Sequence, residues 1–177
     1  TSHHAGSDEF PIHTVQLSAY CLDRYEVTAG DFEQWLKANS LSPEGPDIRN
    51  YNSNGDFLTD RANHPAEGVT WEEASAFCSA QQKSLPTEAQ WEKSARGGCE
   101  FGDDPLNCDK EDLRAYPWGF ETPSCASANH QLSTEQMPSL CTSDTLPAET
   151  DNSGAGPYGH QHLSGNVWEY VSDFWHP

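Results

Sequence analysis

The 177-residue chain is long enough for one domain with its own core, and none of its apolar runs approaches the roughly 20 residues that span a bilayer. Its 28 acidic and 9 basic residues give a formal net charge of −19, which opposes binding to nucleic acid or anionic lipid. We therefore expect no nucleic-acid partner and no transmembrane segment. The acidic residues indicate cations as partners, or else a solvated surface of the kind found on secreted or salt-adapted proteins.

The N-terminal part of the sequence predicts a flexible arm, a strand and a helix. Residues 1–10 form the arm, and residues 13–27 alternate in a way that predicts a strand. Thr28 and Asp31 then form a helix start signal before the sequence "AGDFEQWLKAN". The spacing of the apolar residues places one buried stripe on this helix, formed by Phe32, Trp35 and Leu36.

Two more helices follow a loop rich in Pro, Gly and Asn. In "VTWEEASAFCSAQQ", Thr70 and Glu73 have the spacing of a capping box. In "LPTEAQWEKSARGG", Thr87 and Gln90 have the same spacing, and a glycine ends the helix. The two segments therefore predict short, capped helices.

Residues 99–160 lack periodicity and are too many for an ordinary connection, so this segment requires disulfides or bound calcium for stability. The six cysteines show no CxxC or zinc-finger spacing, which favours disulfides over a metal or thioredoxin-type site. Six thiols allow 15 pairings, and sequence proximity favours Cys99 with Cys108 and Cys125 with Cys141. Disulfides imply a secreted, periplasmic or cell-surface location, with any leader already removed.

Cys21 and Cys78 are left over from this pairing. They could bond to each other, or Cys78 could pair with a cysteine outside this chain. None of the six thiols has a basic neighbour or a partner at catalytic spacing, so we assign them structural roles. The H-x-H pair of His160 and His162 could hold a transition metal on a strand, but no third ligand is predictable.

The last segment, "HLSGNVWEYVSDFWHP", alternates in the manner of a strand. Its aromatic residues need a packing partner, and they are Trp168, Tyr170, Phe174 and Trp175. We expect this strand to pack against the remainder of its domain or against a protein partner or neighbouring subunit, because an open strand with such a face aggregates or recruits another chain.

Six motifs resemble, in order and spacing, the formylglycine-generating enzyme family, also called sulfatase-modifying factor domains. They are "YCLDRYEVTAGDF", "HPAEGVTWEEASAFC", "SLPTEAQWEKSARGG", "YPWG", "ASAN" and "SGNVWEYVSDFW". The resemblance covers nearly the whole chain, so we treat residues 11–177 as one domain of this type. The variants "ARGGCE" and "PSCASAN" are similar to secreted bacterial members.

The resemblance implies an α+β, compact C-type-lectin-like fold with two or three short helices, a small antiparallel sheet and much irregular loop. In the family the domain continues for several dozen residues past the last motif. That continuation carries the two cysteines that bind copper(I) in formylglycine generators, which oxidise a substrate cysteine with oxygen. We therefore expect this domain to be truncated at its C-terminal side, and we assign no catalytic residue within the chain. Cys78 matches a cysteine that in some members bonds to the C-terminal region.

Calcium is the cofactor that the resemblance carries to this chain. One family site matches the carbonyl oxygens of Gly165 and Val167 with the carboxylate of Glu169, an oxygen-only set suited to a hard cation. In this site His162 replaces the usual Asp or Asn, which weakens or alters the site. Another family site matches the side chain of Asn129, the carbonyl of His130 and the carboxylate of Asp144.

Three functions follow from the sequence. The first is an exported, non-catalytic recognition or structural module that is stabilised by calcium and disulfides. Such a module could act as a subunit of a larger assembly. The second is a copper- and oxygen-dependent formylglycine-generating oxidase whose catalytic cysteines lie outside this chain. The third, a module of an iron-dependent sulfoxide synthase, is disfavoured because the His-x-x-x-His-x-Glu motif is absent.

Overall fold

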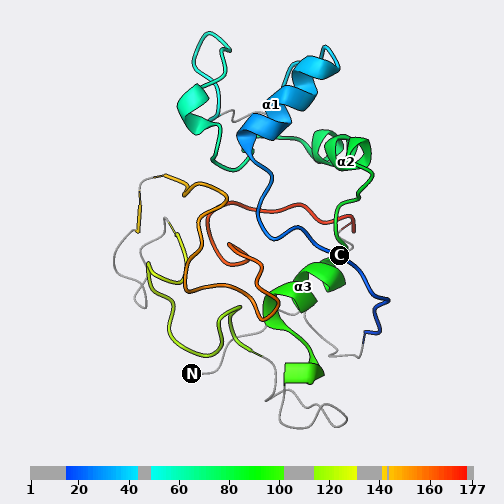
Figure 1. Ribbon diagram of the computed structural model, residues 1–177, viewed down its shortest axis with the longest axis vertical. Helices are drawn as coiled ribbons and strands as arrows, with labels where there is room; N and C mark the ends of the chain where they lie inside the picture. Colours follow the sequence, from blue (N-terminus) through cyan, green and yellow to red (C-terminus); the bar gives the residue numbers. More distant parts are fainter. Residues whose placement is uncertain (1–14, 44–48, 102–113, 131–140, 143, 175–177) are drawn as a thin grey trace.

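The computed structural model describes residues 15–43, 49–101, 114–130, 141–142 and 144–174. Its helical elements are α1 (Ala29–Ala38), η2 (Thr59–Arg61), α2 (Trp71–Ala80), α3 (Glu88–Arg96) and η3 (Cys99–Phe101). Helices α1 and α2 lie at one end of the molecule, whereas α3 lies at the other end, and long irregular segments run between them (Figure 1). In the described part of the chain, no helix has the length and apolar character of a membrane span.

The three predicted helices are confirmed, and each begins at the predicted cap. The Thr28 hydroxyl accepts a hydrogen bond from the Asp31 N–H at 3.1 Å, before α1. Thr70 and Thr87 begin α2 and α3, each within a complete capping box. Gly97 ends α3 at a φ of 81°, a left-handed conformation that favours glycine.

The predicted antiparallel sheet is not found among the described residues. The described parts of the two predicted strands, residues 15–27 and 167–174, are irregular, and only three isolated antiparallel bridges occur in the described chain. Both segments bond to loops instead of to a parallel or antiparallel neighbour. The Gln161 N–H, for example, donates to the Arg24 carbonyl at 2.9 Å, and the Ser172 N–H donates to the Pro86 carbonyl at 2.8 Å. In these two segments, the alternation of polar and apolar residues therefore indicates an extended backbone that does not pair with a neighbouring strand.

The main apolar cluster joins α1 to α2. Phe32 and Leu36 of α1, 4% and 1% exposed, pack against Phe77 of α2, and the Phe32 and Phe77 rings lie 5.7 Å apart. Trp35 packs at the edge of this cluster, so the predicted stripe is confirmed. Burial of these side chains stabilises the helical end of the molecule by about 2 kcal/mol each.

The described chain buries many polar side chains, and most of them lie outside the helices. They are Asn50, Arg61, Glu73, Ser94, Ser127, Asn129, Thr145, Gln161 and His162. A buried polar group costs free energy unless it is hydrogen-bonded, so the irregular segments need specific polar partners. The loops of this fold are held by side-chain hydrogen bonds where other domains use apolar packing.

The disulfide between Cys125 and Cys141 is confirmed, with a Cα–Cα distance of 5.1 Å. Cys99 is also disulfide-bonded, and its predicted partner, Cys108, lies outside the described residues. Cys21 and Cys78 carry free thiols, so a bond between these two is not formed. The predicted N-terminal arm and Trp175 also lie outside the described residues.

Candidate functional site

The residues predicted to bind calcium come together where three loops meet, which we call the loop junction. It comprises residues 127–130, 142 with 144–146, and 163–169. The Asn166 N–H donates to the Asn129 carbonyl at 2.7 Å. The Asn129 amide donates to the Asn166 Oδ1 at 3.1 Å and to the Asp144 carbonyl at 3.0 Å. The two predicted sites are therefore neighbours in one structure.

Asn166 is the centre of the loop junction. Its Oδ1 accepts from the Leu146 N–H at 2.8 Å as well as from Asn129. Its Nδ2 donates to the Leu146 carbonyl at 3.2 Å and to the Glu26 Oε2 at 2.8 Å. These four bonds satisfy the donors and acceptors of the amide group. One side chain therefore joins the chain near residue 26 to both other loops.

Gly165 lets the Asn166 loop approach Asn129. Its φ is +102°, and a Cβ atom at this position would lie 2.3 Å from the Asn129 carbonyl oxygen. Such a contact requires a shift of the backbone, and the φ is strained for any L side chain. Asn166 follows with a φ of 65°, a conformation that asparagine tolerates better than most residues. The Gly-Asn pair therefore fits this turn.

Glu26 is a buried acid at the edge of the loop junction. Its pKa is raised to about 8, chiefly by burial and also by the negative charges of Glu169 and Glu67, while hydrogen bonds from Asn166 and from the Val167 N–H act in the opposite direction. Its Oε1 is buried and has no hydrogen-bond partner. Glu26 is therefore protonated at neutral pH, and it holds the Asn166 amide as a neutral acceptor.

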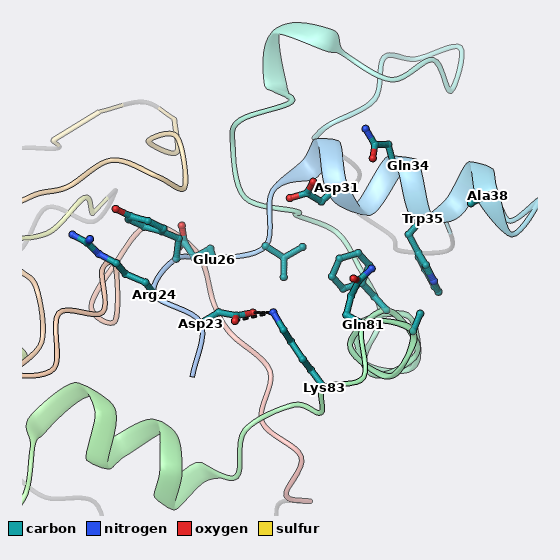
Figure 2. Close-up of a pocket in the computed structure, with 13 residues that line it drawn as sticks. Asp23, Arg24, Glu26, Asp31, Gln34, Trp35, Ala38, Gln81 and Lys83 are labelled. Atoms are coloured by element: carbon teal, nitrogen blue, oxygen red, sulfur yellow. Dashed lines mark hydrogen bonds and ion pairs between the residues drawn. The ribbon is translucent and has the colours of Figure 1, made fainter. Parts of the chain in front are cut away.

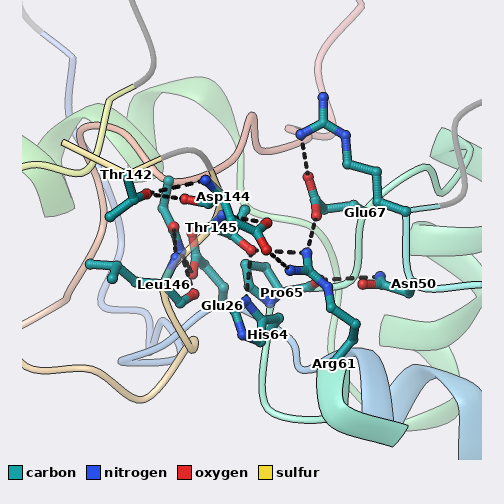
Figure 3. Close-up of polar contacts among 12 residues, drawn as sticks. Glu26, Asn50, Arg61, His64, Pro65, Glu67, Thr142, Asp144, Thr145 and Leu146 are labelled. Atoms are coloured by element: carbon teal, nitrogen blue, oxygen red, sulfur yellow. Dashed lines mark hydrogen bonds and ion pairs between the residues drawn. The ribbon is translucent and has the colours of Figure 1, made fainter. Parts of the chain in front are cut away.

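Asp144 already pairs with a cation of the protein, Arg61, whose guanidinium is buried (Figure 3). Arg61 also donates to the Glu67 carboxylate at 2.9 Å and to the Thr145 hydroxyl at 3.1 Å. Partial burial raises the pKa of Asp144, but the bonds from Arg61 and from the Thr145 N–H outweigh it, so the pKa is lowered. Burial, in contrast, raises the pKa of Glu67.

The predicted calcium set of Asn129, His130 and Asp144, which we call the first set from here on, does not fit calcium in this arrangement. The Asn129 Oδ1 accepts from the Thr142 hydroxyl at 2.8 Å, and the His130 carbonyl accepts from the Cys141 N–H at 3.2 Å. Asp144 is paired with Arg61. Calcium needs six to eight oxygen ligands, and here it would stand beside a buried guanidinium whose positive charge repels it. Arg61 supplies the positive charge that the loops need.

The second set, on residues 165–169, fits calcium in part. The Glu169 carboxylate accepts the Trp91 indole N–H through Oε2 at 2.9 Å, and its other oxygen takes no hydrogen bond from the described residues. The carbonyls of Gly165 and Val167 lie on the same segment. One carboxylate and two carbonyls supply fewer oxygens than a tight calcium site, so water would complete the shell.

The two histidines of the H-x-H pair are buried among loops. His162 is 3% exposed, has a φ of 60° and lies 3.5 Å through Nδ1 from the Asn152 amide. Burial lowers the pKa of His160 and of His162, so both are neutral near pH 7. Among the described residues, neither belongs to a group of three side chains that could hold a metal ion.

Two cavities flank the N-terminal segment. The first has a volume of about 770 Å³ and is lined by charged, polar and apolar side chains (Figure 2). Two of its lining residues form an ion pair, in which the Lys83 ammonium donates to the Asp23 carboxylate at 2.8 Å. The second, which we call the apolar groove, has a volume of about 470 Å³ and contains both free cysteines in its lining. Trp168, Glu169 and Tyr170 form part of its wall.

The described aromatic residues of the last segment are largely exposed, although the Phe174 ring lies 5.7 Å from the Trp71 ring. The Trp168 side chain is fully exposed, Phe174 is 73% exposed and Tyr170 is exposed as well. Val167 and Val171, on the alternate positions, are partly buried. Glu169 and Asp173, on the same positions as the two valines, are exposed, so the segment alternates in burial only in part and is not a strand. We call the residues Trp168, Tyr170 and Phe174 the aromatic face.

Sequence reasoning did not find Glu26, Arg61 or Asn166. Glu26 and Asn166 lie within two of the quoted motifs, "YCLDRYEVTAGDF" and "SGNVWEYVSDFW", which gave a signal for both. Arg61 lies in the aperiodic loop before α2, and no pattern there marks it as the partner of Asp144.

The state of Glu26 gives a prediction about pH. The unfolded carboxyl ionises near pH 4.5, whereas the folded one keeps its proton to about pH 8, so the free energy of unfolding should fall as pH rises between these values. Glu26→Gln removes this dependence, and its amide oxygen can still accept from Asn166. We expect the variant to be more stable than the wild type at pH 8, by roughly 1 to 3 kcal/mol, with the difference vanishing near pH 4.5.

Denaturant unfolding at pH 4.5, 6 and 8 measures this difference. Glu72→Gln, at an exposed position of α2, is the matched control and should show no such growth with pH. A Glu26→Gln protein that loses the same stability at all three values would contradict the protonated state of Glu26.

The comparisons with known proteins agree with the motifs. Formylglycine-generating enzymes of Thermomonospora curvata and Mus musculus are 29% and 28% identical over 94% of this chain, and the chain spans 64% and 52% of their lengths. The serine/threonine-protein kinase pkn1 of Chlamydia caviae is 30% identical over 95% of this chain, which corresponds to 25% of that protein. The chain therefore spans about half to two-thirds of the formylglycine-generating enzymes that it matches.

A solved structure shows the same fold. PvdO from Pseudomonas aeruginosa superposes with a TM-score of 0.55 and 23% identity, over 86% of this chain and 56% of that chain. The family of sulfatase-modifying factor enzyme 1-like domains matches residues 1–177. Motifs, fold and relatives agree, and the chain belongs to the sulfatase-modifying factor enzyme 1-like domain family.

Proposed function

We propose that this chain acts as a non-catalytic recognition or structural module of an exported protein, held together by disulfides. The observation that carries the proposal is the aromatic face, Trp168, Tyr170 and Phe174, exposed beside the apolar groove. Exposed aromatic side chains next to a groove are typical of protein interfaces, because they bury a large area at a low cost in side-chain entropy. The partner is a protein or a neighbouring subunit.

The thiols of the chain support the non-catalytic role. Copper(I) chemistry needs a pair of thiolates, and nucleophilic thiols need a lowered pKa. Cys78 has the opposite property, since burial and the nearby charge of Asp23 raise its pKa. Cys125, Cys141 and Cys99 are in disulfides. Within the described residues, the free thiols are Cys21 and Cys78, and they line the groove without a cationic partner bonded to either sulfur.

The relatives support a modular role in another way. The kinase of Chlamydia caviae contains a match to this chain over a quarter of its length. A domain of this family therefore occurs as one part of a larger protein that carries a different name. By analogy, this chain can present its aromatic face within a larger protein without a reaction of its own.

In this proposal, calcium binds only at the second predicted set, on residues 165–169. Glu169 with the carbonyls of Gly165 and Val167 would bind the ion weakly, because one carboxylate supplies little charge. At Asp144, the ion pair with Arg61 takes the place of calcium. Calcium would then strengthen the segment that displays the aromatic face.

The alternative function is a formylglycine-generating oxidase. The similarity to the enzymes of Thermomonospora curvata and Mus musculus favours it. The family resemblance implies that the cysteine pair that would hold copper in such an enzyme is not among the residues of this chain. The present residues would then contribute the groove and its aromatic wall to the binding of a substrate peptide.

The activity experiment separates these functions. We expect the 177-residue chain, given copper(I) and oxygen, to leave the cysteine of a sulfatase-motif peptide unchanged, because no described thiol pair suits copper. Mass spectrometry of the peptide reads the result, and the Thermomonospora curvata enzyme under identical conditions is the positive control. An aldehyde product formed by this chain would contradict the non-catalytic role, and Cys21→Ser and Cys78→Ser variants would then show which thiol acts.

The aromatic face should drive association of the chain. Covering a few hundred Å² of aromatic surface is worth several kcal/mol at about 25 cal/mol per Å². We therefore expect concentration-dependent self-association of the wild type in sedimentation velocity. Trp168→Ser should shift the sample towards monomer without loss of stability, because this side chain is fully exposed.

The matched control for this experiment is Phe120→Ser, at an exposed aromatic residue outside the aromatic face. It should leave the association unchanged. A wild-type protein that stays monomeric at every concentration would remove the support that the aromatic face gives to the proposed function.

The calcium prediction concerns thermal stability. We expect calcium to raise the Tm with a midpoint on the order of 10⁻⁴ to 10⁻³ M, as in weak sites of extracellular modules. Glu169→Gln should abolish the rise, whereas Asp144→Asn should lower the Tm without changing the calcium response, because it breaks the Arg61 pair. Differential scanning calorimetry with calcium, magnesium or chelator measures this, and a calcium response lost in Asp144→Asn but kept in Glu169→Gln would assign the ion to the other set.

A further inference from the structure

The disulfide between Cys125 and Cys141 has a third chemically active neighbour. The ring of His130 lies beside it, so that one ligand atom from each of Cys125, His130 and Cys141 falls within 4.8 Å of the others. In the described part of the chain, this is the group of three His, Cys, Asp or Glu side chains that meets the distance requirement for holding a metal ion. The proposed function gives the His130 ring no role.

The three side chains are positioned by bonds other than the disulfide. The Cys141 N–H donates to the His130 carbonyl at 3.2 Å. Next to these two residues, the Thr142 hydroxyl donates to the Asn129 Oδ1 at 2.8 Å. These two bonds keep residues 129–130 beside residues 141–142 when the sulfur–sulfur bond is broken.

The turn that carries Cys125 is also fixed independently. The Ser127 hydroxyl donates to the Ser124 carbonyl at 3.0 Å, and the Ala128 N–H donates to the same carbonyl at 2.9 Å. The Ser124 N–H donates to the Ser127 hydroxyl oxygen at 3.0 Å. Cys125 therefore starts from a structured turn in either redox state.

We propose that, after reduction of the disulfide, Cys125, His130 and Cys141 bind one zinc ion. A dithiol reductant passes two electrons and two protons to the two sulfur atoms and becomes a disulfide itself. Zinc then replaces the two thiol protons, which are released to solvent, and takes the imidazole as its third ligand. Two thiolates with one imidazole are a ligand set that zinc prefers, and water fills the fourth position.

The geometry permits this exchange with small movements. Two sulfur ligands of one tetrahedral zinc ion lie about 3.8 Å apart, given zinc–sulfur distances of about 2.3 Å. The Cα atoms of Cys125 and Cys141 are 5.1 Å apart, so side-chain rotation reaches that separation. Cys125 is exposed, and His130 and Cys141 are partly exposed, which gives the reductant and the ion a path to the group.

Zinc would thus replace the disulfide as the cross-link between the segments that carry Cys125 and Cys141. Asn129, which bonds Asn166 at the loop junction, is next to His130 in the chain. A cross-link that is present in both redox states keeps Asn129 in its place at the loop junction. The site differs from the predicted calcium sets, because those use the carbonyl of His130 and oxygen ligands, whereas this one uses its ring and sulfur.

Cobalt is the spectroscopic probe for the site. The full chain is reduced with a phosphine, which becomes a phosphine oxide with oxygen from water and does not compete for the metal as a dithiol would. One equivalent of Co²⁺ added without air should give a thiolate-to-cobalt charge-transfer band, which Zn²⁺ then removes. The unreduced protein should give no band, because its sulfur atoms at this site are in a disulfide.

Two variants locate the metal. Cys125→Ser/Cys141→Ser keeps the other four cysteines, Cys21, Cys78, Cys99 and Cys108, as thiols after reduction and should give no band. His130→Asn keeps the disulfide in the unreduced state, so it folds as the wild type does, and after reduction it should bind zinc at least about tenfold more weakly. His64→Asn, at a histidine outside the group, is its matched control and should bind as the wild type does.

Three results would overturn the proposal. The first is an equal charge-transfer band from the wild type and from Cys125→Ser/Cys141→Ser. The second is unchanged zinc affinity in His130→Asn. The third is loss of the near-ultraviolet circular dichroism on reduction that zinc does not restore. Each of these results is independent of the activity and association experiments, so the zinc site and the proposed function fail or succeed separately.

Discussion

The described structure depends most on the side-chain amide of Asn166. Its four hydrogen bonds join residues near Glu26, Asn129 and Leu146, three segments that lie far apart in the sequence. Without strands in the described chain, no ladder performs this task. The Asn166 amide is half-buried with all its partners satisfied, and its loss would leave those partners unpaired at a cost of about 1 to 3 kcal/mol for each one that is buried. The loop junction is therefore cooperative.

Charge explains why the junction uses Arg61. A chain with a net charge of −19 must keep its buried acids either neutral or paired. Glu26 takes the first course and holds a proton, and Glu67 takes the second beside Arg61, whose guanidinium also pairs with the exposed Asp144. Bound calcium is the other way to compensate carboxylates, and the loops around Asp144 meet the same need with a side chain of the protein itself.

The sequence predicted the helices and the cysteine clasp well, because their signals are local. Thr70 with Glu73, and Thr87 with Gln90, lie three residues apart, and Cys125 and Cys141 are separated by 16 positions in the sequence. The sheet is not found among the described residues, because alternation indicates an extended segment but not its ladder partners, which are set by distant parts of the chain.

The sequence drew attention to the segments of the candidate site, whereas the binding of calcium there stays a prediction. The motifs brought Asn129, Asp144 and Glu169 to attention, and the structure places their segments around one junction. What decides the chemistry is the partner of each oxygen, and Arg61 reaches Asp144 across 83 positions of sequence from a loop without periodicity. No spacing rule contains that information. Ligand identity can therefore be carried over from a family motif only when the atoms that face the ligand are also known, and here the ion pair between Asp144 and Arg61 is the feature that weighs against calcium at the first set.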